Sequence, residues 1–323
     1  MSLNDALHLL LNALGISLPT FGWLVLGMLL ARAGVFPEAL NNRISLLAFR
    51  YGLPLMLFAG AAQVDYSTLG DARYLYAGIV ATFVSLLAAW HYSRWRGHTA
   101  GERGIFVQAA FRSNLAIVGL SLVVAAYGER GTAIAALPVA LMTVLYNILA
   151  VWVLDRTLGM GAGLRGTFLG IVRNPLIIGI SAGVALSLSP LPVPEAIGPV
   201  GRALSQFFLP LVLVCIGAAM SVSRLYRAGA LAWEACAWRL LVAPLLGVSV
   251  ALLMGVRDEA LGILFMLLAA PVAASSHVMV VAARGDGTLA ANVVVLTTLL
   301  SVVTVTLGFF LLSVFSLVGA PQG

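Results

Sequence analysis

The chain is a succession of apolar stretches, each close to the roughly 20 residues that one helix needs to cross a bilayer. Hydrophobic residues occupy 61% of its 323 positions, charged residues only 9%, and the mean hydropathy is +1.05. A soluble domain carries about 25% charged residues, so this chain could not keep its surface in water. We therefore predict an all-α integral membrane protein.

Short breaks containing Gly, Pro and charged residues divide the chain into ten predicted membrane-spanning helices. We place them at residues 8–32, 39–63, 73–94, 103–127, 132–154, 166–188, 196–220, 229–254, 259–283 and 288–315. Together with their loops they fill the sequence, so we expect no soluble domain.

The basic residues, all of them arginine, are unevenly distributed between the two sides of the predicted bundle. The loops and helix ends that follow odd-numbered spans hold Arg32, Arg43, Arg94, Arg96, Arg103, Arg156, Arg165, Arg173, Arg224, Arg227 and Arg284. The opposite side holds Arg73, Arg130, Arg202 and Arg257. Because cytoplasmic loops are enriched in basic residues, both termini should lie outside. We expect a multi-pass protein of a bacterial cytoplasmic (inner) membrane, with the lipid bilayer and not nucleic acid as its partner.

The two halves of the chain match at a nearly constant offset. Pairs separated by 156 residues are Pro19 and Pro175, Pro54 and Pro210, Gly131 and Gly287, and Thr132 and Thr288. We therefore divide the chain into repeats at 1–155 and 156–323, with five spans in each. Because five is odd, the second repeat enters the membrane from the opposite side, an arrangement typical of alternating-access transporters. Gene duplication without a transport role is the alternative.

Polar residues cluster near the middle of the predicted fourth and ninth spans. The fourth contains Arg112, Ser113 and Asn114, and the ninth contains Pro271 followed by Ser275, Ser276 and His277. Polar groups inside a membrane face a protein interior or a wet cavity, and proline leaves a backbone carbonyl free. We predict that both helices are broken at matching depth and form a substrate site. Simple kinks are the alternative.

Two arginines and one asparagine are further candidates for this site. A charge near mid-bilayer costs about 2.5 kcal/mol or more, so Arg112 and Arg50 need compensation. An anionic substrate could supply it, and so could Asp71, a backbone carbonyl or snorkelling. Asn147 could form a wall of the site. Glu234 and Arg239 are interpreted as a local pair or as snorkelling groups.

The sequence offers little for metal or catalytic chemistry. Cys215 and Cys236 fall inside predicted spans and are interpreted as small core hydrophobes. Among the ionisable groups that could act in a catalytic cluster, only His277 is placed deeply, where it could instead carry a proton. We therefore expect no metal site, no bound cofactor and no enzymatic activity.

Several ordered segments resemble the auxin efflux carrier family of permeases. They are Phe111–Ser121 with Tyr127–Gly131, Arg173–Gly179, Pro210–Gly217, and the segment from Pro271 to Asp286. The resemblance implies a ten-helix fold similar to bile-acid symporters and sodium/proton antiporters, with crossing broken helices 4 and 9. It also implies a scaffold of spans 1, 2, 6 and 7, a transport part of spans 3–5 and 8–10, and a homodimer formed through the scaffold. One departure is that Gly119-Leu120-Ser121 lacks a proline found in the family, so the first break should be less sharp.

These observations together predict a secondary transporter of small organic anions. Bacterial members of the family are described as malonate or other organic-acid transporters, and plant members export auxin, also a carboxylate. Asn114, Ser113 and the backbone near Pro271 would hold the carboxylate during an elevator-type movement. The coupling ion, Na⁺ or H⁺, stays open. A non-transporting ligand sensor is the alternative function.

Overall fold

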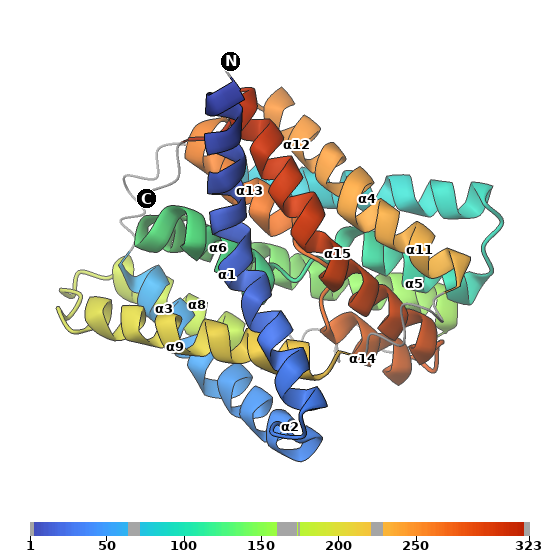
Figure 1. The fold of residues 1–323 in the computed structure, drawn as a ribbon, viewed down its shortest axis with the longest axis horizontal. Coiled ribbons are helices and arrows are strands. Elements are labelled where there is room, and N and C mark those ends of the chain that lie inside the picture. The colour runs from blue at the N-terminus through green and yellow to red at the C-terminus, as the bar shows by residue number, and fades with distance from the viewer. Residues whose placement is uncertain (1–2, 64–71, 160–172, 174, 221–228, 320–323) are drawn as a thin grey trace.

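The computed structural model describes residues 3–63, 72–159, 173, 175–220 and 229–319 (Figure 1). Within these ranges it is all-helical, as predicted, and contains no strand beyond one isolated pair of bridged residues. The helices, and three π-helical turns labelled η, are α1 (Leu3–Arg32), α2 (Glu38–Leu47), η1 (Ala48–Gly52), α3 (Leu53–Ala62), α4 (Arg73–Trp95), α5 (Ala100–Phe111), η2 (Leu115–Gly119), α6 (Leu120–Leu158), α8 (Pro175–Ser187), α9 (Ile197–Ala218), α11 (Ala230–Ala237), η3 (Trp238–Val242), α12 (Ala243–Leu253), α13 (Asp258–Ala269), α14 (Ser275–Ala282) and α15 (Gly287–Val314).

Seven helical stretches of the described chain are long and apolar enough to cross a membrane. They differ from the ten predicted spans in three places. The stretch Leu115–Leu158 joins parts of the predicted fourth and fifth spans, and it turns sharply at Gly128 (φ 56°, ψ −141°), a backbone conformation that residues with a Cβ rarely adopt. The predicted sixth span begins outside the described residues, and the ninth is divided between α13 and α14. Ten spans in an inverted repeat therefore stay a prediction.

Most of the helices pack as two groups, and α15 packs against both of them, through α1 and α13. One contains α1, α3, α8 and α9, and the other contains α4, α5, α6, α12 and α13. In the first group, α1 and α9 cross at Gly27 and Gly217, where an added Cβ would collide with the backbone of the facing helix. Small residues allow this close approach, which is how membrane helices gain packing energy.

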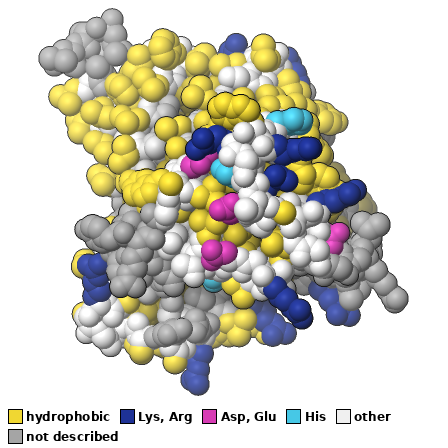
Figure 2. All heavy atoms as spheres, turned by 90° about the vertical axis from the view of Figure 1, so that its right-hand side faces the viewer, with side chains coloured by type: hydrophobic (Ala, Val, Ile, Leu, Met, Phe, Trp, Pro, Cys, Tyr) yellow, Lys and Arg dark blue, Asp and Glu magenta, His cyan; other side chains and the backbone are white. Residues whose placement is uncertain are grey.

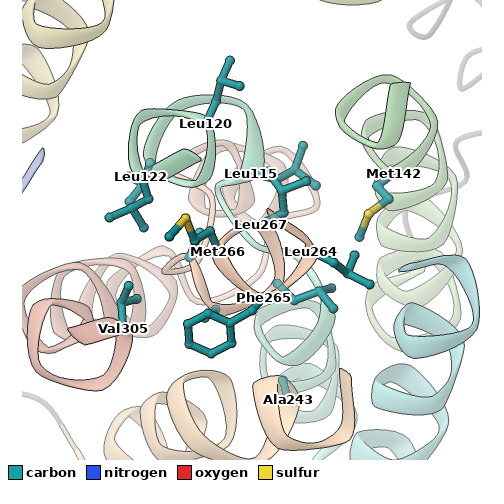
Figure 3. Close-up of a cluster of buried hydrophobic side chains, with 14 of the residues drawn as sticks. Leu115, Leu120, Leu122, Met142, Ala243, Leu264, Phe265, Met266, Leu267 and Val305 are labelled. Atoms are coloured by element: carbon teal, nitrogen blue, oxygen red, sulfur yellow. The ribbon is translucent and has the colours of Figure 1, made fainter. Parts of the chain in front are cut away.

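The second group encloses a core built around α13. Leu264, Phe265 and Leu267 of this helix are buried against side chains that include Leu115 from η2 and Val305 from α15 (Figure 3). This packing fixes the end of α13 inside the protein, beside the segment that follows α5.

Large apolar side chains cover much of the outer surface. Leu245 and Leu253 on α12, for example, are 67% and 87% exposed. Figure 2 shows acidic, basic and histidine side chains gathered on the face that holds the connection between α4 and α5. Apolar helix faces with charges at one end suit a multi-pass membrane protein, in which lipid covers the apolar surface.

Candidate functional site

The predicted fourth and ninth spans are both interrupted, at segments that lie side by side. Helix α5 ends at Phe111 and helical structure resumes at Leu115, whereas α13 ends at Ala269 and α14 begins at Ser275. The first interruption is shorter than the second, in line with the proline that the first lacks.

The two interrupted segments hydrogen-bond to each other through their backbones. The Asn114 N–H donates to the Pro271 carbonyl at 2.7 Å, and the Ala273 N–H donates to the Arg112 carbonyl at 3.2 Å. This short antiparallel bridge is centred on Ser113 and Val272. Buried backbone groups freed by a helix break must find partners, and here each break supplies them for the other.

Arg239, on the π-helical turn η3, lies on the side of this junction where α5 and α13 end. It is only 1% exposed. Its Nη1 donates to the Ala110 carbonyl at 2.9 Å, its Nε donates to the Ala270 carbonyl at 3.1 Å, and its Nη2 donates to the Leu268 carbonyl. The guanidinium therefore ties together the C-terminal ends of two helices.

This position corrects the interpretation of Arg239 and Glu234 as a local pair or as snorkelling groups. Glu234 instead forms ion pairs with Arg96 at 3.2 Å and with His98 at 3.5 Å, at the α4–α5 connection. The two residues lie more than one helical turn apart in sequence and serve different surroundings. Arg239 is a buried structural group.

Arg112 lies at the same junction and is 6% exposed. Its Nη2 donates to Asn147 Oδ1 at 2.8 Å and to Ser275 Oγ at 3.1 Å, and its Nη1 lies 2.9 Å from the Met279 sulfur and 3.5 Å from the Tyr146 carbonyl oxygen. All of these partners are neutral. No carboxylate of the described residues forms an ion pair with Arg112, so its positive charge is available to a ligand.

A cavity of about 680 Å³ opens beside Arg112. The two interrupted segments, together with helices α6 and α14, give it a polar wall that includes Ser113, Asn114 and His277. Helix α9 contributes an opposite, mostly apolar wall that includes Val212 and Ile216. The cavity therefore has a cationic pole and an apolar side, and it lies between the two helix groups.

Two polar side chains at the cationic pole differ in their bonding. The Ser113 hydroxyl and the Tyr146 hydroxyl lie 3.2 Å apart and hydrogen-bond to each other. The Asn114 side-chain amide has no hydrogen-bond partner within the described part of the chain, although the residue is only 8% exposed. A buried, unpaired amide beside a cavity can donate to a bound anion.

Of the nine predicted site residues, the structure brings six to this cavity: Arg112, Ser113, Asn114, Asn147, Ser275 and His277. Pro271 contributes a backbone carbonyl to the junction but does not line the cavity. Ser276 is buried away from the cavity, since Ser275 takes the position that faces it. Its hydroxyl has no hydrogen-bond partner among the described residues.

Arg50, another predicted site residue, lies away from this cavity. Its side chain is exposed and does not line the cavity, and the guanidinium carbon lies 5.7 Å from the centre of the Tyr51 ring. The π-helical turn η1, which precedes Pro54, contains this residue and presents it on the outer surface. Asp71, which we considered as a compensating charge, lies outside the described residues.

Sequence reasoning missed Tyr146 and Asn41. Tyr146 bonds to Ser113, and Asn41 lines the cavity from α2 with its Nδ2 donating to the Cys215 carbonyl at 3.1 Å. Tyr146 precedes the predicted Asn147, so a search for further polar groups in the fifth span could have found it. Asn41 lies close to a helix end, where a polar residue is common and gives no signal of a site.

A second cavity of about 440 Å³ lies between α3, α6 and α9. It is lined by Gln63, Glu129 and Arg202 among others, and Arg202 Nη1 lies 3.0 Å from Glu129 Oε2. Arg202 is near the beginning of α9, whereas the larger cavity contacts the end of that helix. The two cavities thus lie toward opposite ends of α9. Within the described residues, no cluster of His, Cys, Asp and Glu could hold a metal ion.

Comparisons with known proteins agree with a membrane transport role. Residues 16–165 match the family described as "Membrane transport protein". Over 303 residues the chain is 25% identical to a protein of Rhizobium meliloti (strain 1021) described as "Putative malonate transporter". That alignment covers 90% of this chain and 93% of the other protein.

Proposed function

We propose, from the premise that residues 16–165 match the auxin efflux carrier family of membrane transport proteins, that this protein is a secondary transporter of small organic anions. One observation carries the proposal: Arg112 is buried at a cavity and has only neutral partners. An unpaired buried charge is strongly unfavourable, and an anionic ligand would relieve it.

The two walls of the cavity favour a carboxylate with an apolar or short aliphatic body. The carboxylate would accept hydrogen bonds from Arg112 and from the Asn114 amide, since charge-assisted bonds of this kind are the strongest available here. The body would lie against α9 near Val212 and Ile216. Malonate, the substrate for which the Rhizobium relative is named, is one candidate dicarboxylate, and the volume also admits larger monocarboxylates such as auxin.

Transport would follow an elevator-type alternating-access cycle. The group of α1, α3, α8 and α9 would act as scaffold, and the helices that flank Arg112 and Asn114 would move past it. Cavities toward opposite ends of α9 support this proposal, because a moving site must open to each side in turn. The proposal includes ten spans in two inverted repeats, both termini outside a bacterial inner membrane, and a homodimer through the scaffold.

An experiment with purified protein in proteoliposomes tests the proposed function. Wild type should accumulate radiolabelled carboxylates, and Asn114→Ala should lower the apparent affinity about tenfold, because it removes a charge-assisted hydrogen bond. Arg50→Gln is the matched control at an exposed position and should behave like wild type. Saturable binding without any flux would instead identify a ligand sensor on the same fold. Uptake unchanged in Asn114→Ala would remove this residue from the site.

A further inference from the structure

The C-terminal ends of α5 and α13 meet at one buried point. Each helix end carries a partial negative charge of about −0.5, so the two together carry about −1. In transporters with interrupted helices, carbonyl oxygens at such ends coordinate the coupling Na⁺. A cation at this junction is therefore electrostatically favourable, whatever its source.

Arg239 supplies that cation from within the chain. Its guanidinium donates to carbonyls at both helix ends: Ala110 on α5, and Leu268 and Ala270 at the end of α13. Carbonyl oxygens are the ligands that a hard cation such as Na⁺ prefers. Here all three carbonyl oxygens accept hydrogen bonds from the Arg239 side chain. One positive charge also balances the summed helix-end charge of about −1.

The acidic groups that form ion pairs in the described residues are used elsewhere. Glu234 pairs with Arg96, Glu259 pairs with Arg130, and Glu129 pairs with Arg202. None of these carboxylates contacts the junction, so they do not add a second cation-binding group there.

We propose that Arg239 takes the place of a coupling sodium ion, so that this protein binds and moves its anion without Na⁺. The inference rests on the proposed transport function and deepens it. A tethered guanidinium cannot dissociate, and the junction that positions Asn114 is held together at any Na⁺ concentration.

The first test uses wild-type protein alone. Initial uptake rates in NaCl and in choline chloride should agree within about twofold, and the melting temperature of the purified protein should be the same in both salts. A saturable rise of the melting temperature with Na⁺, which would report a bound ion, would overturn the proposal. So would a loss of uptake of about tenfold or more in choline, the size of a typical coupling between two sites. If no carboxylate is taken up in either salt, the proposed function fails, and the melting temperatures still decide the inference.

The second test removes the tethered cation. Arg239→Ala should have a lowered melting temperature that millimolar guanidinium chloride, compared with choline chloride, partly restores by filling the vacated position. Arg112→Ala, which also removes a buried arginine, is the matched control and should lack this stabilisation at the junction. A folded Arg239→Ala protein that guanidinium does not stabilise would contradict the proposal.

If Arg239→Ala does not fold, Arg239→Lys decides. It keeps the charge with fewer donors, so its uptake should stay independent of Na⁺ at a reduced melting temperature. If uptake by Arg239→Lys and uptake by wild type both required Na⁺, the inference would be overturned.

Discussion

The two buried arginines at the helix junction have nearly equal burial but opposite surroundings. Arg239 donates to three backbone carbonyls at helix C-termini, and it does not line the cavity. Arg112 contacts side chains such as Asn147 and Ser275 and lines a cavity of about 680 Å³. The hydrogen-bond partners of an arginine, and not its degree of burial, therefore distinguish a structural charge from one that can bind a ligand.

The difference has a simple electrostatic origin. At the side of the junction where α5 and α13 end, the positive charge of Arg239 offsets the partial negative charge of the helix ends. At the other side, η2 and α14 begin, and helix starts carry partial positive charge that adds to Arg112. The charge at the side of Arg239 is therefore balanced within the protein, whereas the side of Arg112 carries a net positive charge that faces the cavity.

The largest expected effect is on stability, from Arg239→Met. This change leaves the Leu268 and Ala270 carbonyls without a donor, whereas the Ala110 carbonyl keeps the hydrogen bond from Ser85 Oγ at 3.2 Å. Each buried unsatisfied group costs about 1–3 kcal/mol. We expect a loss of about 2 kcal/mol or more, measured as a lower melting temperature in detergent. Equal melting temperatures for Arg239→Met and Arg112→Met would break the comparison between the two arginines.

The next effect is on binding, from Arg112→Gln. Loss of charge-assisted hydrogen bonds worth about 1.5–3 kcal/mol should weaken carboxylate binding about tenfold to hundredfold. Calorimetry or a thermal-shift titration measures it. The ligand-free protein should lose less stability than Arg239→Met does. Undiminished affinity would place the anion elsewhere.

A smaller effect should follow from Tyr146→Phe. The change removes the hydroxyl that lies 3.2 Å from Ser113 Oγ while keeping the ring. A neutral hydrogen bond contributes about 0.5–1.5 kcal/mol, so affinity should fall about twofold to tenfold through a less well positioned Ser113. Ser113→Ala should have a similar effect, and the double variant should add little to either single change. Fully additive losses would show that the two hydroxyls act separately.

The smallest effect should come from Arg50→Gln. Because this arginine is exposed and lies outside the cavity, uptake and affinity should match wild type, and its measurement sharpens the contrast with Arg112. A tenfold loss of affinity would return Arg50 to the site.

The sequence predicted the membrane class and the two helix breaks well. Apolar length determines the solvent, and Pro271 together with the polar group at Arg112–Asn114 determines where a helix cannot continue. The sequence could not predict in which direction each arginine side chain points, because this depends on the rotation of the helix and on partners distant in sequence. Arg239 was misjudged for this reason, and the structure places Arg50 away from the cavity. Asn41 was missed because its role depends on α9, far along the chain.

The most direct measurement is the position of a bound carboxylate in an experimental structure of the protein, using a brominated substrate analogue to locate it. We predict that its carboxylate lies within hydrogen-bond distance of the Arg112 guanidinium and the Asn114 amide, with the brominated body toward α9. A substrate found outside this cavity, with Arg112 paired to a carboxylate side chain of the protein, would contradict the account.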